Sequence, residues 1–154
     1  MSLVLLHTPA EVLSWLLVQM NQAVSWNAFN ADNALAWPVY VGNKPDRPDG
    51  LLVIDDTTPM QDGRVMVGGE AIKHPGFTVT VRGATRGECG AKAEEVFRAL
   101  CEDFYAQLVN VDGRQYVVHS VANMQGPIRI GKETPESRRE LATINGVMTL
   151  TRST

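Results

Sequence analysis

The sequence predicts an α+β domain with a mainly antiparallel sheet and two principal helices packed on it. Two stretches carry apolar residues at helical spacing, and several shorter stretches alternate apolar and polar residues as strands do. The predicted strands fall into two groups, one between the two helices and one after the second helix. Within each group no helix pattern separates successive strands, so neighbouring strands are expected to pair antiparallel through short turns. With 154 residues, the chain suits a single domain spanning 1–154.

The first helix is predicted at about 9–22. Residues 8–11 read Thr-Pro-Ala-Glu, which supplies a capping residue, a proline at the first helical position and a glutamate three residues after the cap. The apolar face that follows is formed by Leu13, Leu16, Leu17 and Met20. Beyond this helix the periodicity ends, and 23–36 is predicted as a loop with Trp26 and Phe29 as buried anchors.

Three strands are predicted between the two helices. Residues 37–42 alternate, 51–54 form a continuous apolar run typical of a buried strand, and 77–82 show the clearest alternation in the chain. The connection 43–50 is rich in turn residues and ends in Asp-Gly. The connection 57–71 is long and polar, a type that in compact domains is usually functional or mobile.

The second helix is predicted at about 87–108, and strands follow it. Its apolar stripe consists of Ala93, Val96, Phe97, Leu100, Phe104 and Leu108. The later strands are expected at 109–111, 116–122, 128–130 and 144–150, the first two joined by an Asp-Gly turn.

Composition and charge exclude several classes of protein. The chain has 14 Lys and Arg against 17 Asp and Glu, a formal net charge of −3, so it lacks the basic footprint of a nucleic-acid binder. The apolar runs near the N-terminus, 3–6 and 15–18, are too short to form a membrane span or a signal-peptide core. We therefore expect no membrane association.

The two cysteines indicate a reducing compartment. Cys89 and Cys101 both fall in the second predicted helix, twelve residues apart, which places them about 18 Å apart along its axis. A disulfide needs Cα atoms closer than about 7 Å, so these two thiols are expected to be free.

The common catalytic and metal-binding motifs are not found in the sequence. His7, His74 and His119 have no ligand spacing among themselves, and no Cys-x-x-Cys pair exists. The Gly-rich segment 83–92 departs from a phosphate-binding loop, because Ala91 separates the last glycine from the lysine. The sequence predicts no catalytic, cofactor-binding or metal-ligating residue, and no cofactor.

Two hypotheses of enzymatic function stay open. Asp55 and Asp56 follow an apolar strand and have Asp62 nearby, an acidic cluster of the kind that a small metal-dependent enzyme uses. Cys101 and His119 would form a nucleophile pair if the fold brought them together, which the sequence does not show.

Turn and strand signatures in the middle of the chain resemble a known family. In order they are Trp-Pro-Val-Tyr-Val-Gly at 37–42, Pro-Asp-Arg-Pro-Asp at 45–49, Asp-Asp-Thr at 55–57, Asp-Gly-Arg at 62–64 and His-Pro-Gly at 74–76. The strand at 79–82, the Gly-rich turn, Lys92-Ala93 and the strand at 143–145 fit the same pattern. Over about 37–150 the chain resembles small structural proteins of tailed bacteriophages, of the tail-terminator and minor-capsid type.

The resemblance implies a virion protein of the tail or neck, made in the cytoplasm of the host bacterium. Such a subunit forms a ring, commonly a hexamer, that caps the tail tube and joins it to the head-tail connector protein. DNA passes through the ring without specific binding, and the family has no catalytic residues to carry over. A head-completion or neck protein and a tail-tube subunit are the alternatives within the same class.

The long connection 57–71 is the predicted interface with a neighbouring subunit or the tube. It contains Met60, Arg64 and Met66, and methionine and arginine are enriched in protein interfaces. The simpler interpretation is a surface loop without a partner.

Overall fold

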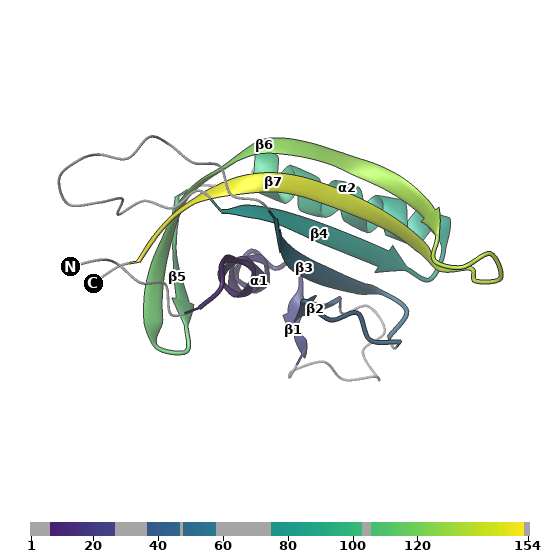
Figure 1. Ribbon diagram of the computed structural model, residues 1–154, viewed down its shortest axis with the longest axis horizontal. Coiled ribbons are helices and arrows are strands. Elements are labelled where there is room, and N and C mark those ends of the chain that lie inside the picture. The colour runs from purple at the N-terminus through teal and green to yellow at the C-terminus, as the bar shows by residue number, and fades with distance from the viewer. Residues whose placement is uncertain (1–6, 27–36, 47, 58–74, 103–105, 153–154) are drawn as a thin grey trace.

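The computed structural model describes the whole chain except residues 1–6, 27–36, 47, 58–74, 103–105 and 153–154 (Figure 1). The elements in chain order are α1 (Pro9–Gln19), β1 (Val24–Ser25), β2 (Pro38–Val41), β3 (Leu51–Thr57), β4 (Gly76–Gly83), α2 (Arg86–Cys101), β5 (Gln107–Val111), β6 (Arg114–Lys132) and β7 (Glu140–Arg152). The seven strands form one sheet in the order β1-β2-β3-β4-β7-β6-β5.

The predicted fold class is wrong in its architecture. Strands hold half of the described residues, and they curl into a half-barrel instead of forming an open antiparallel sheet with two helices laid on it. β1 with β2 and β2 with β3 pair parallel, while the remaining pairs are antiparallel. Helix α1 lies in the curl against β1, β2, β3 and β5, and α2 packs against β4, β6 and β7 (Figure 1).

The length of β6 and β7 explains the curl. The sequence predicts two short strands, 116–122 and 128–130, where the structure has β6 running without a break over 19 residues beside the 13 residues of β7. Long paired strands accumulate twist, and each bulge bends the strand further. The β6–β7 ladder shifts register at four places, so the pair arches over the helices.

The parallel β2–β3 pair has a different cause. Nine residues, 42–50, join the two strands, and they carry the chain back to the end of the sheet where β2 began. Parallel neighbours usually need a longer crossover, most often a helix. For this reason the sequence favoured antiparallel pairing of β2 with β3. The structure shows that this prediction is wrong, because the connection returns to the end of the sheet where β2 begins.

The predicted helix starts are confirmed, and the predicted helix ends are too late. Thr8 caps α1, and both halves of the capping box with Glu11 are present. The helix ends at Gln19 and not at 22, since Asn21 adopts a left-handed backbone with φ of 61°. Helix α2 ends at Cys101, so Leu108 belongs to β5 and is exposed rather than part of the helical stripe.

One hydrophobic core joins both helices to the concave face of the sheet. Alternate residues of β4 and β7 point into it, and all four residues of the apolar run at 51–54 are buried, as predicted. Its largest apolar members are Leu13, Leu16, Leu17, Leu52, Ile54, Phe77, Leu100, Tyr116, Ile144, Met148 and Leu150.

A buried arginine on β4 gathers the connection between β2 and β3. The Arg82 side chain is 1% exposed, and its Nε donates a hydrogen bond to the carbonyl of Asp49 at 3.1 Å. Its Nη2 donates to the carbonyls of Pro45, Asp46 and Pro48 at 2.7, 3.1 and 2.7 Å. Its Nη1 forms an ion pair with Glu133, in the turn between β6 and β7, at 3.2 Å.

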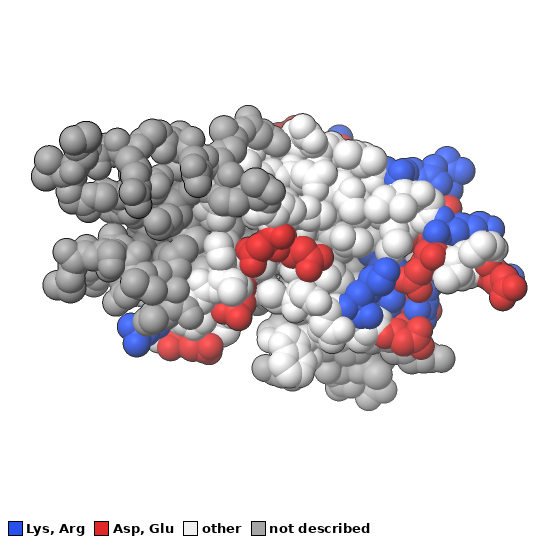
Figure 2. All heavy atoms as spheres, viewed as in Figure 1, with Lys and Arg blue, Asp and Glu red and all other residues white. Residues whose placement is uncertain are grey.

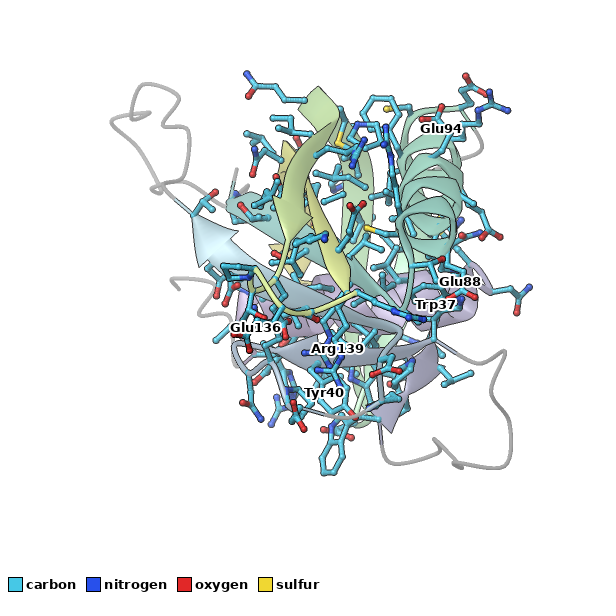
Figure 3. The ribbon with its side chains drawn as sticks, turned by 90° about the vertical axis from the view of Figure 1, so that its right-hand side faces the viewer. Trp37, Tyr40, Glu88, Glu94, Glu136 and Arg139 are labelled. Atoms are coloured by element: carbon cyan, nitrogen blue, oxygen red, sulfur yellow. The ribbon has the colours of Figure 1, made fainter. Side chains whose placement is uncertain are left out.

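A second arginine closes the same cluster from the β6–β7 turn. Arg139 pairs through Nη2 with Asp49 at 2.7 Å, and through Nη1 with Asp46 at 3.1 Å and Glu133 at 3.5 Å. Figure 3 looks onto this end of the molecule, with Arg139 labelled in the cluster. We call Arg82, Arg139 and Glu133, together with Pro45, Asp46, Pro48 and Asp49, the Arg82 clamp. It ties two loops that are distant in sequence to one central strand.

Helix α2 begins in close contact with the end of β4. A Cβ atom on Gly83 would lie 2.5 Å from the backbone nitrogen of Cys89 and 2.7 Å from its Cα. Only glycine leaves room for this approach, which occurs two residues after Val81 enters the core. Thr85 then caps the helix by accepting a hydrogen bond from the Glu88 nitrogen at 3.3 Å.

Arg82→Met is expected to lower the free energy of unfolding by about 3 kcal/mol, because it leaves buried carbonyls and Glu133 without their donor. Urea denaturation measures the loss. Arg98→Met, which removes an exposed pair with Glu94 on α2, is the control and is expected to cost less than about 0.5 kcal/mol. Equal losses in the two variants would contradict the role assigned to the clamp.

Gly83→Ala is expected to destabilise the fold by about 2 kcal/mol, since its new methyl group meets the fixed backbone of α2. Gly90→Ala is the matched control. Gly90 lies inside the same helix with open space around it, so that substitution should stabilise by about 0.5–1 kcal/mol. Thermal melts of the two variants should therefore shift in opposite directions.

Glu133 makes the clamp sensitive to acid. Burial by itself raises the pKa of the Glu133 carboxyl, but the hydrogen bond from Arg82 and the charges of Arg82, Lys44 and Arg139 outweigh it and hold that pKa below its ordinary value of 4.5. Because the folded pKa is the lower one, the ionised carboxylate stabilises the fold above the unfolded pKa. This contribution is lost as the pH falls through 4.5 and then through the folded pKa.

Glu133→Gln is expected to be less stable than the wild type near neutral pH, with the difference shrinking as the pH falls below the unfolded pKa. Urea unfolding at about pH 7 and about pH 3 measures it. A difference that stays constant across this range would show that the carboxylate charge does not stabilise the clamp.

Candidate functional site

An open groove of about 540 Å³ lies between α1 and the β1–β2 edge of the sheet. Clefts of roughly 300–1,000 Å³ are typical of binding sites in proteins. The lining residues are Glu11, Ser14, Trp15 and Val18 from α1, Ser25 and Trp26 at β1, Val39, Tyr40, Val41 and Asn43 at β2, and Asp112 from the β5–β6 turn. We call this site the aromatic groove.

Helical periodicity places Trp15 in the groove. Leu13, Leu16 and Leu17 point from α1 into the core, whereas Glu11, Trp15 and Val18 are spaced along another face of the same helix. The Trp15 side chain is 43% exposed there. The helical periodicity places Trp15 on the side of α1 that faces away from the core. This position was a signal for the site in the sequence that the sequence-based predictions missed.

Trp26 forms the opposite wall. It follows directly after β1 and is 58% exposed, so the prediction that it is a buried anchor is wrong. Val41, at the end of β2, is 37% exposed. A two-residue strand at the edge of the sheet buries little, which leaves the ring of Trp26 outside the core. The predicted second anchor, Phe29, lies outside the described residues.

The groove is acidic. Its lining includes the carboxylates of Glu11 and Asp112, and no lysine or arginine is among the lining residues that the structure describes. Glu11 also accepts a hydrogen bond from the backbone of Thr8 in the capping box, at 3.3 Å. The Asp112 side chain is 74% exposed and lies 3.9 Å from His7, whose Nδ1 is 2.7 Å from the Tyr116 hydroxyl.

The predicted acidic cluster is divided by the fold. Asp55 and Asp56 are neighbours in β3, so they point to opposite faces of the sheet, and Asp62 lies outside the described residues. Asp56 Oδ1 accepts a hydrogen bond from the backbone nitrogen of Ala10 at 2.9 Å, in the first turn of α1. Burial raises the pKa of Asp56, and the Ala10 hydrogen bond partly offsets this. Asp56 therefore accepts a hydrogen bond from a backbone N–H group at the start of α1.

The other residues with potential chemistry form no recognisable catalytic or metal-binding arrangement among the described residues. Within the part of the chain that the structure describes, no three His, Cys, Asp or Glu side chains gather as a metal site would require. Cys89 and Cys101 are both free thiols, and His119 Nε2 lies 2.9 Å from the hydroxyl of Thr151. Lys92 of the Gly-rich segment is buried, pairs with Glu95 at 3.3 Å and lies 5.8 Å from the centre of the Trp37 ring.

The interface predicted at 57–71 is not tested by the structure, since Met60, Arg64 and Met66 lie outside the described residues. None of the helices in the described ranges has the length and apolar character needed to cross a membrane.

Comparisons with known proteins leave the chain without an assigned family. No family model matches it, and no curated protein matches it. Among solved structures, a chain with no functional name superposes with a TM-score of 0.44 at 18% identity, covering 80% of this chain and 87% of that chain. Similarity of this degree assigns neither fold nor function.

Asp56→Ala is expected to lower the free energy of unfolding by about 1 kcal/mol, because it removes an acceptor from the first turn of α1. Asp55→Ala, at the exposed neighbouring position, is the control and should change stability by less than about 0.5 kcal/mol. Adding Mg²⁺ should leave the melting temperature of the wild type unchanged. A Mg²⁺-dependent rise that Asp56→Ala abolishes would instead support the metal-dependent alternative.

Proposed function

We propose that this chain is a structural protein of the tailed-bacteriophage virion, a tail terminator. Its copies form a ring that caps the tail tube and joins it to the head-tail connector protein. The segments that resemble this family run through β2, β3, β4, α2 and β7, which form the centre of the sheet and the helix against it. Under this proposal the protein works through shape and contact and catalyses no reaction.

The distribution of exposed apolar side chains supports the proposal. Six large hydrophobic residues are exposed among those described: Trp15, Trp26, Val41, Leu108, Ile128 and Ile130. Three line the aromatic groove, and two lie near the end of β6, so five of the six fall on two separate surfaces of one subunit. Ring assembly needs two different surfaces per subunit, because each contact joins one surface to the other on the next copy.

The distribution of charge is compatible with a ring around DNA. The formal net charge is −3, and Figure 2 shows Lys and Arg gathered mainly at the end where β6 turns into β7, mixed with acidic residues. A strongly basic lumen would bind the phosphate backbone and retard its passage. The proposed ring should therefore show weak, salt-sensitive affinity for DNA at most.

Electron microscopy of the purified protein tests the proposal. We expect single rings, alone or on the ends of purified tail tubes, and tails of irregular length when the gene is deleted from its phage. Long stacked polymers would instead favour the tail-tube alternative. A chain that forms no ring, binds neither end of a tube and leaves tail length unchanged when deleted would show that the proposal is wrong.

A further inference from the structure

In the part of the chain that the structure describes, the last part of β6 forms an edge of the sheet. Strand β5 pairs with β6 only over Arg114–Val118, whereas β7 accompanies β6 to Lys132. From Ser120 onward, β6 therefore has one strand neighbour among the described residues. Unpaired edges present backbone donors and acceptors that natural proteins cover, bend or use for binding another chain. The bulges in this stretch bend the edge and leave it open.

The end of that edge combines apolar and basic side chains. Ile128 and Ile130 are 47% and 57% exposed. Arg129 lies between them and pairs with Glu140 of β7 at 3.1 Å, and exposed Lys132 makes no ion pair with a described residue. We call residues 128–132 the basic edge.

We propose that the basic edge of one copy docks into the aromatic groove of the next copy, head to tail. This inference rests on the proposed function, because both require the chain to assemble with itself. It names the two surfaces that meet and the direction of the contact.

The chemistry of the two surfaces is complementary. The groove exposes the rings of Trp15 and Trp26 beside the carboxylates of Glu11 and Asp112, and the described residues of its lining include no cation. The basic edge contributes two exposed isoleucines and the cation of Lys132, while Arg129 is already paired with Glu140 at 3.1 Å. Such pairing removes apolar surface from water and sets opposite charges against each other, which selects partner and orientation.

The basic edge lies far along β6 from the Asp112 end of the aromatic groove. Ile128 lies sixteen residues beyond Asp112, with β6 running continuously between them, about 50 Å along the strand at 3.3 Å per residue. Figure 1 shows the β5–β6 turn and the β6–β7 turn at opposite ends of the molecule. In the proposed contact the groove takes the edge of a different copy, and repetition of that contact closes a ring when the rotation allows.

Two blocking variants and one control test the contact. Trp15→Lys places a cation in the groove and keeps the helix stable, since it lies four residues after Glu11 on α1. Ile130→Glu places an acid on the basic edge. Leu108→Glu is the matched control, because Leu108 is also on a strand and is also 57% exposed, outside both surfaces. Circular dichroism and thermal melts establish that each variant is folded.

Mixing the two variants is the decisive experiment. In analytical ultracentrifugation each blocked variant alone should remain monomeric under conditions where the wild type and Leu108→Glu assemble. An equimolar mixture retains one intact groove and one intact edge, so it should form a one-to-one dimer that does not grow. Val41→Lys and Ile128→Glu repeat the test at the same two surfaces if either first variant fails to fold.

The outcomes separate this inference from the proposed function. Assembly of both blocked variants like the wild type overturns the inference alone, and so does a mixture that yields no dimer. Loss of assembly in Leu108→Glu as well would also overturn it, because the effect would not be specific to the two surfaces. A wild type that stays monomeric both alone and with tail tubes overturns the proposed function together with the inference.

Discussion

The arrangement of the strands depends on the hydrogen bonds that the buried guanidinium of Arg82 donates. A charge taken out of water is costly unless every donor is satisfied, and Arg82 satisfies its donors with four backbone carbonyls of one connection and with Glu133. Those carbonyls belong to the segment that brings the chain from β2 back to the start of β3. The arginine thus replaces the crossover helix that a parallel strand pair usually needs. Arg139 adds the β6–β7 turn to the same cluster.

The position of the groove follows from that arrangement. Because β2 runs parallel to β3, it carries Tyr40 and Val41 along α1, and the short β1 adds Trp26 at the same edge. The curl of the sheet brings the β5–β6 turn to the other side of α1, where Asp112 completes the lining. The same curl sends the far end of β6 away from the groove. One subunit therefore presents two dissimilar surfaces, which head-to-tail assembly requires.

Local patterns in the sequence predicted the elements that depend on neighbouring residues. The capping box at Thr8 and Glu11, the buried run at 51–54 and the Asp-Gly turn before β6 were predicted and are present. The predictions that are wrong concern features set by residues distant in the sequence. Trp26 is read as buried because tryptophan is apolar, but its strand is too short and too near the edge to cover it. Strand β6 is read as two strands because glycine and proline interrupt its alternation at 126–127, yet pairing with β7 continues on both sides of them.

By itself the sequence determined where helices and turns begin, which run is buried, and that the two cysteines do not bridge, because these properties follow from residues a few positions apart. Only the tertiary structure decided that β2 and β3 are parallel, that the sheet curls, and that Trp15, Trp26 and Asp112 line one groove. The reason is that strand direction and side-chain convergence are set by contacts between segments far apart in the chain. The hydrogen bonds of Arg82 to Pro45 and Pro48, and the pairing of β7 with β6 from Tyr116 to Lys132, are two such contacts that no local pattern encodes.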